Sequence, residues 1–143
     1  MRRFAVSYVD RLLSTDDYSG IAELCAIISG SATFSPEASD YGLPLVGFTF
    51  VESLGWFAQS IRSGAVTYYE ATTRFRQEAM LSALRLCAPQ ANANWYERGM
   101  ADWPYGERIR ALDEWISAND DELHKWLREL LREHRSIVLE LTA

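Results

Sequence analysis

The clearest pattern in the chain is the helical spacing of apolar positions over residues 122–141. The repeated positions are Leu123, Trp126, Leu127, Leu130, Leu131, His134, Val138 and Leu141. Since successive residues of an α-helix are rotated by about 100°, these side chains share one face. Glutamates border that face on one side, and lysine or arginine residues border it on the other. The pattern predicts a helix that packs its apolar face on other helices and exposes a charged outer surface.

Three- and four-residue spacing also dominates the rest of the chain, without an internal repeat. It predicts helices over residues 3–13, 45–63, 91–100, 107–117 and 120–139. Two further helices are predicted to begin at a capping residue: one begins at Ser14 or Thr15 and ends at Gly30, and the other begins at Thr72 or Thr73 and ends at Cys87. Residues 45–51 are rich in aromatic and branched side chains, so a strand stays open there as the alternative. Residues 31–43 form the longest connection, with a short helical turn expected near Pro36. We therefore predict an all-α fold, a single-domain bundle of six or seven short helices over residues 1–143.

Charge restricts the class of partner. Fourteen basic and twenty acidic residues give a net charge of −6. A negative protein is repelled by nucleic acid phosphates and by anionic membrane surfaces, which argues against direct nucleic acid binding and against membrane binding. The most apolar stretch, residues 43–51, is too short to span a bilayer.

The two cysteines and the chain start bear on the compartment. Cys25 and Cys87 each fall on a helical apolar stripe, and they are interpreted as buried thiols in a reducing environment. Residues 1–6 carry positive charge, but Ser7, Asp10 and Arg11 interrupt the apolar run that an export signal requires. These features predict a cytoplasmic protein.

Most of the net negative charge falls between residues 102 and 122, where seven carboxylates face only two arginines. The candidate partner-binding residues are Asp102, Trp103, Tyr105, Glu107, Asp113, Glu114, Asp120, Asp121 and Glu122. The acids would attract a basic partner, and the two aromatic side chains would anchor it. Two alternatives stay open: the acids form a solvated face and cap a helix start, and the aromatics close the end of the core.

Neighbouring tyrosines at 68 and 69 stand about 100° apart if the segment is helical, so at least one of them is expected to be exposed.

His134 falls within the apolar stripe and is expected to be a buried, hydrogen-bonded core residue. His124 and His134 lack a metal-binding motif, and the serines lack a nucleophile elbow. We therefore predict no catalytic residue, no metal and no cofactor.

Several short motifs in the second half of the chain occur together in one order. They are Ser63-Gly64-Ala65-Val66-Thr67-Tyr68-Tyr69, residues 78–85, residues 95–100, residues 112–115 and residues 121–123. In this order and spacing, residues 45–138 resemble the DNA-mimic-protein family, a bacterial helical family largely catalogued as a domain of unknown function. The chain departs from the usual family pattern at Ser63, Ala65, Val66 and Tyr68, where Asn, Gly, Phe and Gln are expected.

The resemblance implies an acidic all-helical bacterial protein that binds another protein by presenting carboxylates in place of DNA phosphates. Related domains also look like antitoxins or immunity proteins. The expected function is an inhibitor, immunity or DNA-mimic protein that covers a basic surface of a toxin or DNA-binding protein. The alternatives are a small hydrolase with a carboxylate-based site between helices and a homo-oligomeric scaffold, such as a homodimer.

Overall fold

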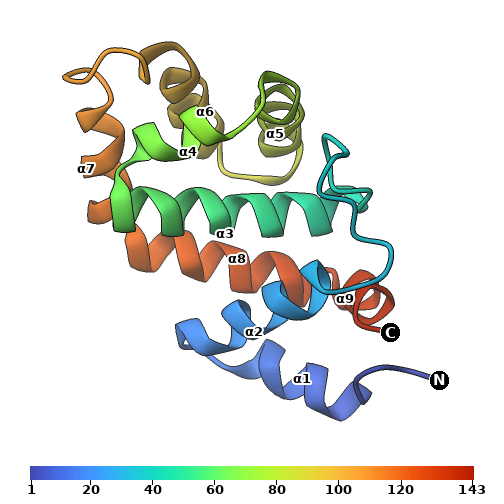
Figure 1. Ribbon diagram of the computed structural model, residues 1–143. Helices are drawn as coiled ribbons and strands as arrows, with labels where there is room; N and C mark the ends of the chain where they lie inside the picture. The colour runs from blue at the N-terminus through green and yellow to red at the C-terminus, as the bar shows by residue number, and fades with distance from the viewer.

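In the computed structural model, which describes residues 1–143, every regular element is an α-helix (Figure 1). The helices are α1 (Val6–Ser14), α2 (Tyr18–Ser29), α3 (Leu45–Ser63), α4 (Ala65–Ala71), α5 (Arg74–Cys87), α6 (Gln90–Asp102), α7 (Arg110–Ala118), α8 (Asp120–Glu133) and α9 (Arg135–Leu141). The all-α prediction is confirmed, and residues 45–63 form a helix and no strand. The predicted number of six or seven helices is wrong, because there are nine. None of them combines the length and apolar character that crossing a bilayer requires.

Helix α3 forms the centre of the molecule. Figure 1 shows α3 and α8 running side by side, with α4, α5 and α6 on one side of them and α1 and α2 on the other. Twelve of the 19 residues of α3 are buried, among them Phe50, Trp56 and Phe57. A single cluster of 29 buried residues extends from Val9 in α1 to Val138 in α9. Burial of this apolar surface around α3 is the main source of stability.

The additional helix α4 follows α3 after one residue. Gly64 turns the chain there with φ of 91°, a conformation that glycine adopts without strain. Seven residues are too few to show a helical period in the sequence, so α4 was not expected. Tyr68 is 6% exposed and Tyr69 is 1% exposed, because α4 is covered by α3 on one side and by α6 on another. The prediction that one of these tyrosines is exposed is therefore wrong.

The predicted helix over residues 120–139 is interrupted at His134, which separates α8 from α9. His134 has φ of −117° and ψ of 39°, and its Nδ1 lies 2.9 Å from the carbonyl oxygen of Leu130. The change of direction lets α9 pack across α3 so closely that a Cβ atom on Gly47 would come within 2.7 Å of Leu141. His134 is hydrogen-bonded as predicted, but it is half-buried and not a core residue.

Local hydrogen bonds settle the predicted helix ends. Asp17 caps α2 by accepting from the backbone N–H of Ser19 at 3.0 Å, so the prediction of a cap at Ser14 or Thr15 is wrong. Thr73 caps α5, one of the two predicted alternatives. The expected helical turn near Pro36 is a hydrogen-bonded turn from Ser35 to Ala38 and no helix.

The two ends of the chain are tied together. The guanidinium of Arg2 donates to the carbonyl oxygen of Leu139 at 2.8 Å and to the hydroxyl of Thr142 at 3.0 Å. Arg3 donates to the carbonyl oxygen of Ala143 at 3.1 Å. Both ends accordingly lie on the same side of the molecule in Figure 1.

Candidate functional site

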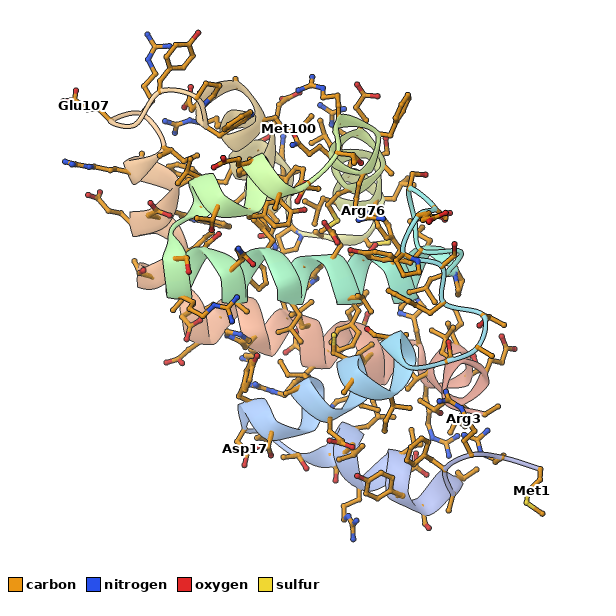
Figure 2. All side chains as sticks on the ribbon, in the orientation of Figure 1. Met1, Arg3, Asp17, Arg76, Met100 and Glu107 are labelled. Carbon is orange, nitrogen blue, oxygen red and sulfur yellow. The ribbon has the colours of Figure 1, made fainter.

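The predicted partner-binding residues lie along one continuous stretch, from the end of α6 through the next loop and α7 to the start of α8. Tyr105, Glu107, Glu114, Asp121 and Glu122 are exposed, whereas Asp102, Trp103, Asp113 and Asp120 are half-buried. Figure 2 shows Glu107 at the outer edge of the molecule, on the loop between α6 and α7. The nine residues therefore do not form one uniform surface.

Asp113 makes a structural contact. Its Oδ1 accepts from the backbone N–H of Ala65 at 2.6 Å and so satisfies a donor at the start of α4. Glu114, the next residue, is exposed and makes no such contact. Of these two neighbouring acids, only Glu114 presents a free carboxylate to a partner.

The two candidate aromatic anchors also differ. Trp103 packs against the hydrophobic core, as the alternative interpretation predicted. Tyr105 is exposed, and the guanidinium of Arg108 lies over its ring, 4.8 Å from the centroid. A basic side chain thus already occupies one face of the exposed aromatic ring, and within residues 103–109 the charge of Arg108 balances that of the single acid, Glu107.

Two of the predicted acids meet acids from the opposite end of the sequence. Asp120 and Asp121 at the start of α8 line a cleft of about 530 Å³ together with Asp16 and Asp17 at the start of α2. We call this the acidic cleft; its other lining residues are Tyr18, Ala58, Ile61, His124 and Arg128. The sequence placed all four acids at helix starts but did not show that the two helix starts meet.

The acids from α2 are held in their charged form. The hydrogen bond from Arg132, at 2.9 Å, lowers the pKa of Asp16, and the attraction of the same guanidinium lowers it further. Hydrogen bonding by Ser19, through its hydroxyl and its backbone N–H, lowers the pKa of Asp17. Both carboxylates are therefore negative at neutral pH.

His124 forms part of the wall of the acidic cleft. Its Nδ1 lies 2.7 Å from the carbonyl oxygen of Asp120 and 3.1 Å from the Oδ1 of the same residue. A carbonyl oxygen only accepts, so Nδ1 carries the proton and Nε2 is the acceptor in the neutral ring. Edge-to-face contacts with Tyr18 and Phe57, at 5.3 Å and 6.0 Å between centroids, fix the plane of the imidazole.

Apolar side chains also line the cleft. Tyr18 and Ile61 are 49% and 50% exposed, so both can contact a bound partner. Negative charge beside apolar side chains suits a long basic side chain, which has an apolar stem and a charged head. No three or more histidine, cysteine, aspartate or glutamate side chains are arranged to hold a metal ion.

A second polar cluster was missed at the sequence level and lies inside the molecule. Glu52 of α3 is 4% exposed; its Oε1 accepts from the hydroxyl of Tyr41 at 2.6 Å, and its Oε2 accepts from the hydroxyl of Tyr68 at 2.5 Å. The Tyr68 oxygen lies 2.8 Å from that of Tyr96, which extends the network to α6. Burial, followed by the charge of Glu52, raises the pKa of Tyr41 and of Tyr68, so both phenols stay protonated donors.

One signal could have revealed this cluster. Glu52 is the single charged residue between Asp40 and Arg62, in the most apolar part of the chain. A charged residue within such a stretch is either exposed on one helix face or buried with dedicated partners. The identity of those partners, which come from a loop and from α4, was not visible in the sequence.

The cysteines are free and half-buried. Burial raises the pKa of Cys25, which keeps its thiol protonated at neutral pH. A protonated, half-buried thiol is a poor nucleophile.

Comparison of this chain with protein-family models, with curated proteins and with solved structures found no match.

Proposed function

We propose that this chain is an acidic helical module that binds a basic segment of another protein and covers it. The observation that carries the proposal is the acidic cleft, which is lined by carboxylates from the starts of α2 and α8 together with the exposed side chains of Tyr18 and Ile61. Helix capping accounts for Asp17, but Asp121 is exposed and has no such contact within the chain. A bound arginine or lysine would find carboxylates and apolar side chains next to each other in the cleft.

Electrostatic attraction would act before contact. The net charge of −6 and the exposed acids of the 102–122 stretch draw a basic partner toward this end of the molecule. Inhibitors, immunity proteins and DNA mimics act in this way, and a toxin or a DNA-binding regulator is the kind of partner proposed.

The resemblance to the DNA-mimic-protein family stays a prediction. The free thiols of Cys25 and Cys87 are in keeping with a cytoplasmic location, which is also part of this proposal.

The test uses a fluorescent arginine-rich peptide as the probe and a double variant, Asp17→Asn with Asp121→Asn. Asparagine caps a helix about as well as aspartate, so the change removes two charges without removing the cap. We expect affinity to fall about tenfold, the equivalent of about 1.4 kcal/mol, and the wild-type affinity to weaken as salt rises.

The matched control is Glu107→Gln with Glu114→Gln, which also removes two negative charges but outside the acidic cleft. We expect an affinity within about twofold of wild type, because screening weakens charges that do not contact the probe. Equal losses in the two double variants would contradict a site at the cleft, and binding that does not respond to salt would contradict the electrostatic mechanism.

The hydrolase alternative would need a carboxyl group that donates a proton near neutral pH. The acidic cleft has the carboxylates, but the pKa values of Asp16 and Asp17 are lowered, the opposite of what a general acid requires. This favours binding over hydrolysis as the proposal. Turnover of a substrate that disappears in His124→Ala would reverse the preference.

The homo-oligomer alternative has a specific candidate surface on α5. Phe75 and Leu86 are 79% and 75% exposed, and their separation of eleven residues places them on one face of the helix. Sedimentation at several concentrations would detect self-association. Loss of it in Phe75→Ser with Leu86→Ser would locate the interface.

A further inference from the structure

A second hollow lies between α2 and α3, beside the acidic cleft, and we call it the apolar groove. It is open to solvent and has a volume of about 470 Å³, within the range of sites for small organic ligands. Small residues on the two helices keep it open: Ala22 and Ala26 from α2 face Gly55 and Ala58 from α3. A Cβ atom added to Gly55 would meet no other atom within 4 Å, which shows how much space remains there.

Aromatic rings line one end of the groove. Phe34 and Tyr41, from the connection between α2 and α3, stack on each other with 4.7 Å between ring centroids. Tyr18 lines both the groove and the acidic cleft. Ring faces carry partial negative charge and attract cations as well as apolar groups.

Glu52 also lines the groove and has no cationic partner. Tyr41 and Tyr68 each donate one hydrogen bond to its carboxylate, but no arginine or lysine forms an ion pair with it. The guanidinium of Arg76 stacks on Tyr41 at 4.1 Å and donates to carbonyl oxygens of the 31–44 loop, so it is engaged elsewhere (Figure 2). A buried carboxylate without a positive partner is costly, and attraction to a positive ligand beside it would offset part of that cost.

We propose that the apolar groove binds a small organic ammonium ion, with its charged nitrogen beside Glu52 and its apolar body over the aromatic rings and the alanines. The carboxylate supplies charge complementarity, the rings supply apolar contact, and the small residues supply the space. The proposal is separate from the binding of a basic protein segment at the acidic cleft, and either can hold without the other.

Calorimetric titration with three probes of similar shape tests the proposed ligand class. Phenethylamine carries the ammonium group, phenethyl alcohol is its neutral counterpart, and hydrocinnamate carries a carboxylate. We expect phenethylamine to bind at least about tenfold more tightly than the alcohol, and hydrocinnamate not to bind. Equal affinities for the amine and the alcohol, or no binding of the amine at millimolar concentration, would overturn the proposal.

Three variants locate the site. Gly55→Leu fills the groove, and leucine is a better helix former than glycine, so the fold is retained. Its matched control is Gly106→Leu, at an exposed loop glycine where an added Cβ atom also meets nothing within 4 Å. We expect the first to abolish phenethylamine binding and the second to leave it unchanged, whereas Glu52→Gln lowers affinity for the amine toward that for the alcohol.

The neighbouring acidic cleft is the competing location for the amine. Asp17→Asn with Asp121→Asn removes charge from the cleft and leaves the lining of the groove intact. We expect this double variant to bind phenethylamine like the wild type. Loss of amine binding there, together with wild-type binding by Gly55→Leu, would show that the amine occupies the cleft and would overturn the proposal.

Discussion

The acidic cleft and the apolar groove adjoin each other along α2, yet they treat negative charge in opposite ways. In the cleft, four carboxylates stand at helix starts, and three of them, Asp16, Asp17 and Asp121, are exposed, so solvent screens them and little free energy is needed to keep them charged. In the groove, one carboxylate is buried and is fixed by two phenol hydroxyls. The exposed carboxylates attract a basic partner from a distance, and salt weakens this attraction. The buried carboxylate fixes the position of the side chains around it and acts only on a ligand that it contacts.

The largest expected difference is in stability. Glu52→Ala removes the acceptor of two buried phenols and leaves a cavity, so we expect the free energy of unfolding to fall by about 3 kcal/mol. Urea unfolding measures it. The exposed Glu114→Ala should change the same quantity by less than about 0.5 kcal/mol. Similar losses in both variants would remove the distinction between buried and exposed carboxylates.

The neighbouring acids of α7 give the next largest effect. Asp113→Ala leaves the backbone N–H of Ala65 without its acceptor, and we expect a loss of about 1.5 kcal/mol in the free energy of unfolding. If Asp113→Ala proves as harmless as Glu114→Ala, the 2.6 Å contact does not stabilise α4 in solution.

A smaller effect of opposite sign is expected in the apolar groove. Gly55 lies within α3 and its Cβ position is open, so Gly55→Ala should raise the free energy of unfolding by about 0.5 to 1 kcal/mol. The midpoint of thermal unfolding would rise accordingly. A lower midpoint would mean that the groove closes in solution and that the added methyl group is crowded.

The smallest effect depends on pH and belongs to the acidic cleft. Arg132 lowers the pKa of Asp16 in the folded chain below its ordinary value of 3.8. The stability contributed by this carboxylate is therefore complete above that value and is lost as the pH falls through the lower folded pKa. We expect wild type to exceed Asp16→Asn in unfolding free energy at neutral pH, with the difference vanishing in acid. A difference that grows on acidification would refute the sign of the shift.

Much of the fold follows from local patterns. The long helices α3, α5 and α8 show apolar positions at helical spacing, and Gly30 and Gly64 mark helix ends as expected. The break at His134 was not predictable from spacing, because the apolar stripe continues in phase across it. The chain turns there through the packing of α9 on α3, a contact between residues far apart in the sequence.

The candidate site was predictable only in part, for the same reason. Asp120 and Asp121 were recognised as surface acids, and Asp16 and Asp17 were recognised as helix-start acids. Their convergence is tertiary, because it depends on how α2 and α8 pack beside each other. Asp113 was also predicted to be a surface acid that binds a partner. In the structure its carboxylate instead accepts a hydrogen bond from the start of α4, which is distant in the sequence.

The joined chain ends have a practical use. Arg2 and Arg3 hold the first residues against the last, on the side of Figure 1 away from the start of α8. A short linker could therefore close the chain into a circular permutant, reopened at the exposed residues 104–108. A tether attached at either end to a sensor surface would leave the acidic cleft pointing outward, so partners can be captured without blocking the region that is meant to recognise them.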